Sequence, residues 1–324
     1  MSRIAASLAA VLAALALAGC GGGAEPDAPS GGAPATLILD FQPNAVHAGI
    51  YAALAHGELE RRGIDLSVQV PGASTDAPKL LRAGRADIAV MDIHDLAIAR
   101  GQGIDLVGVG ALVQRPLAAV IAGDRDRVRS PADLFGATVG VTGLPSDDGV
   151  LRAILDSTGY GAEPPETITI GFGSVAALRA GKVDAATAFW NVEGVALRRA
   201  GVPTREFRVD SYGAPSYPEL VLVTTRERLD ADRDGIARIL DGLRAGYASV
   251  IRDPEGAREE LLAAVPALQP AAAAAQLRAL RGAFGPPLAL KRPVLEEWAG
   301  WEARYGIVDR PPDIDAAFDF GVGG

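Results

Sequence analysis

Polar and aromatic side chains follow several apolar segments of the sequence, at the point where each segment ends. They are Asp40, Phe41 and Asn44 with His47 and Tyr51 beyond them, then Asp92 and His94, then Trp190, Asn191 and Glu193, and finally Tyr217 and Glu219. Aromatic faces beside a few carboxylates and amides suit a flat, polar heterocycle, because rings stack and carboxylates accept from ring or amino N–H groups. The pattern therefore predicts a binding site for such a ligand.

Each of these residues taken alone has a simpler structural explanation. A single His after a strand is commonly solvated or capped, and Trp190 suits the packing between two lobes. Asp40 and Asp92 suit the N-cap of a helix. The recurrence at successive strand ends favours a cleft, since ligands of open α/β sheets collect at the carboxyl edge of the strands.

The common motifs of catalysis and metal binding are missing from the sequence. It has three histidines (His47, His56 and His94), no HExxH motif and no pair of cysteines. It also has no GxSxG elbow, no GxxxxGK[ST] loop and no GxGxxG after a strand. Hydrolase, nucleotide-binding and dehydrogenase functions lack their essential parts, so we expect no catalytic residues, metal or cofactor.

The first twenty residues predict export. Arg3 precedes an apolar run over 4–17, which is too short for a membrane span of about 20 residues. The order Leu17-Ala18-Gly19-Cys20 resembles the lipobox of bacterial lipoproteins, in which the Cys is acylated, and Cys20 is the only cysteine. We predict a lipoprotein signal over 1–20, a Gly/Pro-rich tether over 21–35 and an extracytoplasmic protein anchored to the membrane by lipid on Cys20.

Net charge and length restrict the remaining possibilities. A net charge of −9 argues against nucleic acid or anionic lipid as a partner, since both select for clustered Lys and Arg. The body that follows the tether exceeds what one hydrophobic core usually organises, so two lobes are expected.

Apolar strands alternate with short helices along most of the body, which is typical of βαβ units around a parallel sheet. The predicted strands are 36–40, 64–70, 86–91, 106–112, 117–122, 137–141, 167–170, 185–188 and 221–224. The predicted helices are 46–62, 76–83, 95–100, 148–158, 174–180, 230–251, 255–264, 271–283 and 294–305.

The pattern of elements restarts at the predicted strand 117–122. A Gly-x-x-Asp motif occurs twice, as Gly84-Arg-Ala-Asp87 and as Gly181-Lys-Val-Asp184, each time after a short helix and before a strand. This repetition favours two lobes of similar build. The alternative is that the two motifs match by chance, because Gly is common at the ends of helices. We predict one lobe from 36–115 with 221–324 and a second from 116–220. The chain then crosses between the lobes near 112–117 and 220–221, and two adjacent crossings form a hinge.

Five segments together carry a resemblance to a known family. They are Leu39-Asp-Phe-Gln-Pro-Asn44 with His47, Gly49 and Tyr51, Gly84-x-Ala-Asp-Ile-Ala-Val90, Gly181-Lys-Val-Asp-Ala185, Trp190-Asn191-x-Glu193-Gly194 and Tyr217-Pro-Glu219-Leu220. This set resembles the thiamine-pyrimidine family of ABC-transporter substrate-binding proteins, whose members bind formylaminopyrimidine or, in close relatives, riboflavin. The resemblance implies the type II periplasmic-binding-protein fold, with two α/β lobes, a two-crossing hinge and the ligand cleft between the lobes.

The resemblance also implies roles for individual residues. Asp40, Asn44, His47, Tyr51, His94, Trp190, Asn191, Glu193 and Tyr217 would line the cleft, and Phe41 stands where many relatives carry Trp. Trp190 and Tyr217 would stack on the ligand, while Asp40, Asn191 and Glu193 would select its hydrogen-bonding edge. The expected partners are an ABC permease with its ATPase, and the protein is expected to act as a monomer.

Two alternatives stay open. The first is a receptor of the same fold that binds riboflavin or an alkanesulfonate. An anion such as a sulfonate favours Arg in its binding site, and the sequence places no Arg at the end of a predicted strand. The family also has an enzyme branch, a pyrimidine synthase that uses pyridoxal phosphate on a lysine four residues before a histidine matching His94. Val90 stands at that position, and the cysteine-rich iron motif of the branch has no counterpart here. An enzyme using His47 or His94 with Asp92 or Glu193 as acid and base is the less favoured hypothesis.

Overall fold

The computed structural model describes residues 32–72, 76–159 and 165–322. The predicted export signal, the acylated Cys20 and most of the predicted tether lie outside these ranges. Residues 33–35, predicted as the end of the tether, instead belong to strand β1 (Ala33–Ile38), where the N–H of Ala33 donates to the carbonyl of Gly63 at 2.8 Å. Within the described ranges, no helix has both the length and the apolar character that a membrane crossing needs.

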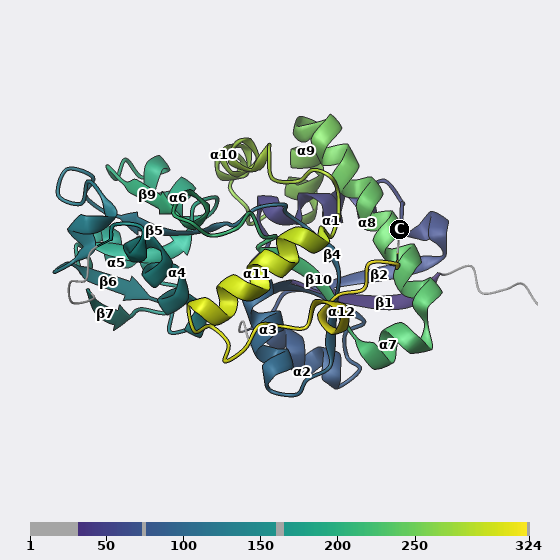
Figure 1. Ribbon diagram of the computed structural model, residues 1–324. Helices are drawn as coiled ribbons and strands as arrows, with labels where there is room; N and C mark the ends of the chain where they lie inside the picture. Colours follow the sequence, from purple (N-terminus) through teal and green to yellow (C-terminus); the bar gives the residue numbers. More distant parts are fainter. Residues whose placement is uncertain (1–31, 73–75, 160–164, 323–324) are drawn as a thin grey trace, which may run out of the picture. The chain divides into compact units, whose positions relative to one another are not determined.

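Five strands form a first sheet in the order β2-β1-β3-β10-β4 (Figure 1). Besides β1 they are β2 (Ile64–Gln69), β3 (Ile88–Asp92), β4 (Leu106–Ala111) and β10 (Leu220–Thr225). β1 is parallel to β2, with Ala33 opposite Ile64, and parallel to β3, with Leu37 opposite Ile88. β10 is antiparallel to both β3 and β4.

A second sheet repeats this plan with the strands in between, in the order β7-β6-β8-β5-β9. Its members are β5 (Ala118–Ala122), β6 (Thr138–Val141), β7 (Glu166–Thr169), β8 (Ala185–Phe189) and β9 (Arg205–Arg208). β6 is parallel to β7 and β8, whereas β5 is antiparallel to β8 and β9. We call the first sheet with its helices the first lobe and the second sheet with its helices the second lobe.

Each sheet is mixed, whereas the alternation of strands and helices in the sequence had indicated βαβ units around a parallel sheet. The antiparallel member is the strand that enters from the other sheet: β5 directly follows β4, and β10 is reached from β9. These connections carry no βαβ crossover, which is the unit that makes neighbouring strands parallel. Strand β9 was not predicted at all.

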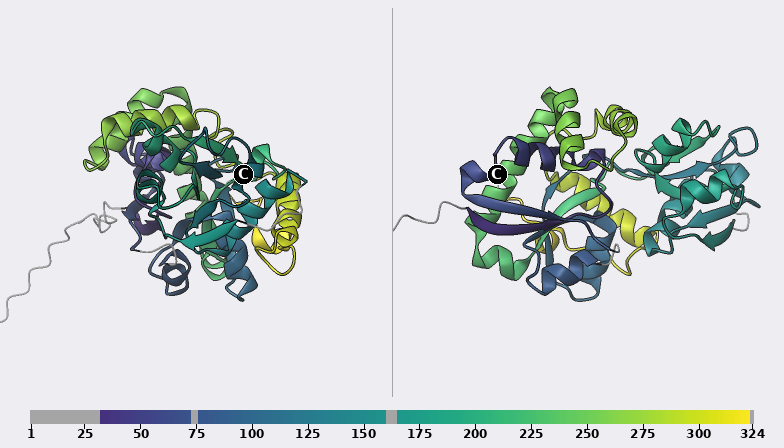
Figure 2. Two further views of the ribbon diagram at one scale, coloured as in Figure 1. Left: turned by 90° about the vertical axis from the view of Figure 1, so that its left-hand side faces the viewer. Right: turned by 180° about the vertical axis from the view of Figure 1, so that it is seen from behind.

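Helices cover both faces of the first sheet (Figures 1 and 2). Helices α1 (Ala48–Ala55), α8 (Arg233–Arg252) and α9 (Pro254–Ala264) lie on one face, and α2 (Asp76–Arg82) and α3 (Ile93–Gly101) lie on the other. Successive side chains of a strand point to opposite faces of the sheet, which explains this arrangement. Leu37 and Leu39 are buried with α1 and α8, whereas Ile38 is buried with α2 and α3. Helix α7 (Arg226–Ala231) connects β10 to α8.

The second lobe is built the same way. Helices α5 (Ser174–Arg179) and α6 (Glu193–Arg199) are buried with Ala119 and Ile121 of β5, while α4 (Pro145–Asp156) is buried with Val120. The remaining helices are α10 (Pro270–Leu280), α11 (Arg292–Arg304) and α12 (Ile314–Ala317). Short 3-10 turns stand at Ala45–His47, Glu60–Arg62, Pro131–Leu134 and Val209–Ser211.

Two long predicted helices are interrupted. The segment predicted as one helix over 46–62 consists of a 3-10 turn, α1 and a second 3-10 turn, because Gly57 adopts a positive φ of 64° after α1. The segment predicted as 230–251 consists of α7 and α8, which meet at Asp232. The side chain of Asp232 accepts from Gly235 N and so caps α8. Helix α6 was not predicted.

The repeated Gly-x-x-Asp motifs make the same contacts in the two lobes. Gly84 and Gly181 both have a φ of 63°. The N–H of Asp87 donates to the carbonyl of Thr36, whose own N–H donates to the Asp87 carboxylate at 2.8 Å. Asp184 makes the matching pair with Thr138, at 2.8 and 2.9 Å. The same geometry beside β1 and β6 favours a common build for the lobes over a chance repetition of the motif.

Helix α11 contacts both lobes (Figure 1). Its Glu302 pairs with His94 of the first lobe. Just beyond α11, Ile307 packs on α4 of the second lobe so closely that a Cβ on Gly149 would lie 2.4 Å from the Ile307 side chain. Glycine at position 149 therefore permits this approach.

Candidate functional site

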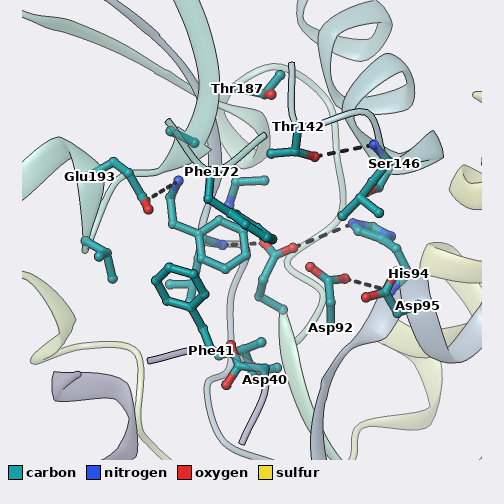
Figure 3. A pocket seen from close by; sticks show the side chains of 18 of the residues that line it. Asp40, Phe41, Asp92, His94, Asp95, Thr142, Ser146, Phe172, Thr187 and Glu193 are labelled. Atoms are coloured by element: carbon teal, nitrogen blue, oxygen red, sulfur yellow. Dashed lines mark hydrogen bonds and ion pairs between the residues drawn. The ribbon is translucent and has the colours of Figure 1, made fainter. Parts of the chain in front are cut away.

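A pocket of about 1170 Å³, including its open mouth, is lined by residues of both lobes (Figure 3). The first lobe contributes the loop after β1, the junction of β3 with α3 and the start of β10. The second lobe contributes the segments that follow β6, β7 and β8. The carboxyl ends of the parallel strands of both sheets thus meet at the pocket, which is the edge where ligands of α/β folds bind.

Two phenylalanines from opposite lobes touch in this pocket. Phe41 follows β1 and Phe172 follows β7, and their ring centroids are 5.3 Å apart with an interplanar angle of 49°. Phe172 is 57% exposed, which is unusual for a large apolar side chain, and Phe41 is half-buried. A partly exposed aromatic pair offers faces on which a flat ring can stack.

Asp40 is held in place by His47. The backbone N–H of Asn44 donates to His47 Nδ1 at 3.2 Å, so Nε2 carries the proton and donates to Asp40 Oδ1 at 2.7 Å. The Asn44 side chain is also engaged, because it accepts from Val46 N and donates to Gln42 O. Asp40 and Asn44 line the pocket, whereas His47 is fully buried and orients Asp40 from outside the lining.

His94 is the centre of a buried ionic network. Its Nδ1 pairs with Glu302 Oε1, and its Nε2 lies 3.2 Å from the hydroxyl of Tyr217 and 3.6 Å from Glu219 Oε1. His94 is 1% exposed, and Tyr217, Glu219 and Glu302 are 0% exposed. Burial by itself lowers the pKa of His94, but the surrounding carboxylates, Glu302 first, raise it to about 10. His94 is therefore a cation at neutral pH.

Burial raises the pKa of several carboxyl groups that line the pocket. The pKa of Asp95 rises to about 6, and that of Asp92 lies well above its ordinary value. Desolvation also raises the pKa values of Glu193 and Glu219. Groups that take up protons this readily are typical of binding and active sites.

Asp92, His94 and Glu219 place one ligand atom each within 4.8 Å of one another, which is close enough to hold a metal ion. The chemistry of the set does not fit one. A ligating imidazole is neutral and offers a free nitrogen, whereas His94 is a cation with both nitrogens engaged by Glu302 and Tyr217. The arrangement fits an internal ion pair.

Asn191 is the least satisfied side chain of the pocket wall. It is 0% exposed, and neither its Oδ1 nor its Nδ2 has a hydrogen-bond partner among the described residues. A buried amide without partners costs about 1–3 kcal/mol, so a ligand that bonds to it recovers this free energy. Glu193, two residues on, accepts from the N–H of Phe189 at 3.0 Å and lines the same wall.

The structure brings eight of the twelve predicted site residues to the pocket and leaves four out of its lining. Those at the pocket are Asp40, Phe41, Asn44, Asp92, His94, Asn191, Glu193 and Glu219. Asp92 is also an N-cap, because it accepts from His94 N at 2.8 Å. His47, Tyr51, Trp190 and Tyr217 are buried without lining the pocket.

The expected stacking role of Trp190 and Tyr217 is not supported by their positions. Trp190 is 1% exposed, donates its Nε1 hydrogen to Pro116 O at 3.0 Å and lies under the guanidinium of Arg208. Tyr217 is packed between His94 and Trp301, with ring centroids 5.0 and 5.5 Å away. Both are core residues in this structure, and for Trp190 this is the simpler explanation that the sequence had left open.

Sequence reasoning missed Phe172, Asp95 and the Thr142–Asp147 segment, all of which line the pocket. Phe172 stands in Gly171-Phe-Gly173 and the Thr142 segment follows a predicted strand, so the strand-end rule applied to the second lobe would have found both. Asp95 lies in the first turn of α3, which was predicted to begin only at that residue.

The two mixed sheets and the pocket shared by two lobes define a class of protein, the periplasmic-binding-protein fold. The alkanesulfonate-binding protein SsuA from Xanthomonas axonopodis pv. citri, solved with MOPS bound, superposes with a TM-score of 0.72. The superposition covers 89% of this chain and 99% of that protein at 19% sequence identity, so it shows the fold. The fold predicted from the sequence is confirmed.

The family is narrower than the fold. The model of the family described as "NMT1/THI5 like" matches residues 44–257, and the chain belongs to that family. It is 30% identical over 227 residues to the formylaminopyrimidine-binding protein of Halalkalibacterium halodurans, covering 70% of this chain and 69% of the relative. It is 24% identical over 241 residues to the 4-amino-5-hydroxymethyl-2-methylpyrimidine phosphate synthase of Legionella pneumophila, covering 72% and 74%.

Proposed function

We propose that this protein is the substrate-binding component of an ABC importer and that its ligand is a thiamine pyrimidine precursor, formylaminopyrimidine. One observation carries the proposal: a pocket between the lobes combines a partly exposed aromatic pair, Phe41 and Phe172, with the buried amide of Asn191, which has no partner among the described residues. These are the groups that a flat ring with polar edges needs. The 30% identity to a formylaminopyrimidine-binding protein supports the same ligand.

In this proposal the two lobes, 36–115 with 221–324 and 116–220, close over the ligand about the crossings near 112–117 and 220–221. Phe41 and Phe172 come from opposite lobes, so a ring held by both favours the closed form. The closed form would be what a permease with its ATPase recognises, the receptor acting as a monomer. Acylation of Cys20 and an extracytoplasmic position are parts of the proposal that rest on the sequence.

The synthase relatives make an enzyme the competing function, and the residues at the pocket argue against it. Val90, at the position of the synthase lysine, is 0% exposed and lines the pocket. The described lining residues include no lysine, so it offers no amine for a Schiff base. The cysteine-rich motif is also missing, since Cys20 is the sole cysteine.

Calorimetric titration of the purified protein tests the proposal. The protein is unfolded and refolded to remove bound ligand, then titrated with formylaminopyrimidine, its deformylated amine, thiamine and riboflavin. Micromolar or tighter binding of formylaminopyrimidine, tighter than that of the other three compounds, is the expected result. Binding of riboflavin alone would make riboflavin the ligand, and no binding across the panel would contradict the pyrimidine assignment.

A further inference from the structure

We propose, building on the proposed function, that Asp95 selects the ligand by pairing its carboxylate with a ring nitrogen and the amino group beside it. Asp95 lies in the first turn of α3 and lines the pocket (Figure 3). Neither the sequence pattern nor the relatives' names point to it. Two properties of the pocket support this role: its other carboxylates already accept hydrogen bonds from the protein, and its charge favours a ligand that brings protons.

Six carboxylate residues line the pocket, and five of them already accept a hydrogen bond from the protein. Asp40 accepts from His47 Nε2, Asp92 from His94 N, Asp147 from Thr142 N, Glu193 from Phe189 N and Glu219 from Leu117 N. Asp95 is the exception, because no hydrogen bond joins its carboxylate to another described residue. It is half-buried, so a ligand in the pocket can reach it.

The charged groups around Asp95 are mostly acidic. His94 on the same helix is the one cation facing it, and it is already paired with Glu302 of α11. Asp40 on the loop after β1, Asp147 on α4 and Asp92 at the start of α3 add negative charge. The described lining residues include no Arg and no Lys. A pocket of this kind favours ligands that bring a proton or N–H donors.

An amidine edge, in which an amino group stands next to a ring nitrogen, satisfies this requirement with two contacts. The amino group donates to one oxygen of Asp95, and a single proton is shared between the other oxygen and the ring nitrogen. The complex therefore contains one proton that belongs to the pair. Burial already brings the pKa of Asp95 to about 6, so the proton is gained near neutral pH without large cost.

The pH dependence follows from counting this proton. Above pH 6, free Asp95 is ionised and a weakly basic ligand is neutral, so binding takes up a proton and affinity falls by up to about tenfold per pH unit. At a pH below the pKa values of both Asp95 and the ligand, the free carboxyl group and the free ring nitrogen each carry a proton. Because the complex holds only one, a proton must be released on binding, and the affinity falls again. The affinity is expected to be greatest near pH 6.

The test uses calorimetry of the purified protein with 4-amino-2-methylpyrimidine as the probe and 2-methylpyrimidine, which lacks the amino group, as the control probe. Titrations at pH 7.5 in two buffers of different ionisation enthalpy measure proton uptake directly. Wild-type protein is expected to take up close to one proton per probe and to ignore the control probe. Binding of the probe without proton uptake would overturn the role of Asp95 and leave the proposed function standing.

Two variants separate this pairing from general acidity. In Asp95→Asn the amide presents a carbonyl to the amino group and an N–H to the ring nitrogen, so binding should persist with no proton uptake and with equal affinity at pH 6 and 8. In Asp95→Ala the affinity at pH 6 should fall about tenfold or more. Asp148→Asn, on the exposed side of α4, should match wild type in both respects.

The outcomes are distinguishable. Proton uptake by Asp95→Asn equal to that of wild type would assign the proton to another carboxylate and overturn the inference. Failure of wild type to bind any aminopyrimidine at any pH would overturn the proposed function, and the inference with it. A thermal melt of each variant verifies that it is folded before its titration is interpreted.

Discussion

Glu219 accepts, at Oε2, a hydrogen bond of 2.5 Å from the backbone N–H of Leu117, and the two residues belong to different crossings between the lobes. The same oxygen accepts from Ala118 N at 2.9 Å. Glu219 is 0% exposed, so these bonds are shielded from water. The carboxylate therefore joins the two crossings at the point where the chain passes from one sheet to the other, beside the pocket.

Replacing Glu219 with Ala is expected to destabilise the protein by about 3 kcal/mol, because it leaves two buried backbone N–H groups without an acceptor. Glu219→Gln keeps a carbonyl oxygen in the same place and should lose less than half as much. Urea unfolding followed by circular dichroism gives both values. Equal losses in the two variants would mean that the charge beside His94, and not the two N–H bonds, is what matters.

The His94 network makes stability depend on pH in the alkaline range. The folded-state pKa of His94, about 10, lies above its ordinary value of 6.5, so its contribution is complete below pH 6.5 and is lost as the pH rises toward 10. The full effect is at most about 5 kcal/mol. The free energy of unfolding, measured in urea from pH 6 to 10, should decline in wild type.

His94→Gln is the control for this decline. Glutamine cannot titrate, so the variant should be less stable at pH 6 and should lose much less stability between pH 6 and 10. A variant with the same slope as wild type would show that other groups cause the decline.

Trp190 and Phe172 are expected to respond in opposite ways to truncation. Trp190→Ala removes a fully buried indole and should cost about 3–5 kcal/mol of stability. Phe172→Ala removes a side chain that is 57% exposed and should leave the ligand-free melting temperature nearly unchanged while weakening ligand affinity by about 1–2 kcal/mol. Unfolding and titration of both variants decide the matter. A stable Trp190→Ala with lost affinity would restore Trp190 as a stacking residue.

The sequence predicted most elements of the fold because strands and helices here follow local patterns. The apolar run Thr36–Asp40 and the Gly84 stop are readable from neighbours in the chain, and the structure places a strand and a helix end there within a few residues. The direction of β5 and β10 is not a local property. It depends on which sheet a strand joins, and that is decided by packing between segments far apart in the sequence.

The candidate site was predictable to the extent that strand ends indicate position. Asp40, Asp92 and Glu193 lie at strand ends and reach the pocket. Trp190 also follows a strand, yet its ring contacts Pro116 and Arg208 and not the pocket. Successive side chains in extended backbone point to opposite sides, and the residues on either side of Trp190 in the chain line the pocket. Whether an aromatic residue at a strand end faces ligand or core requires knowledge of the partners on each side.

The matched motifs at Asp87 and Asp184 predict matched energetics. Each carboxylate accepts from a backbone N–H of the strand beside it, Thr36 N of β1 or Thr138 N of β6, and each pairs with an arginine, Arg228 or Arg127. Asp87→Ala and Asp184→Ala should each cost about 1–2 kcal/mol in urea unfolding. A large cost at one position and none at the other would show that the two motifs, despite their shared geometry, stabilise the lobes differently.

The pocket is expected to reject sulfonates, although the alkanesulfonate-binding protein shares the fold. An anion is held by basic side chains or by free N–H groups at a helix N-terminus. The described lining residues include no Arg and no Lys, and the N–H groups of Thr142 and Gly143 ahead of α4 already donate to Asp147 Oδ2, at 2.7 and 3.1 Å. A carboxylate of the protein thus takes up the donors that a bound anion would use.

Titration with ethanesulfonate or MOPS should give no heat with wild type, and neither compound should compete with an aminopyrimidine. Asp147→Ser frees these N–H groups and removes a negative charge, so weak sulfonate binding in this variant alone would support the argument. Micromolar sulfonate binding by wild type would contradict it and would make a sulfonate the ligand of this pocket.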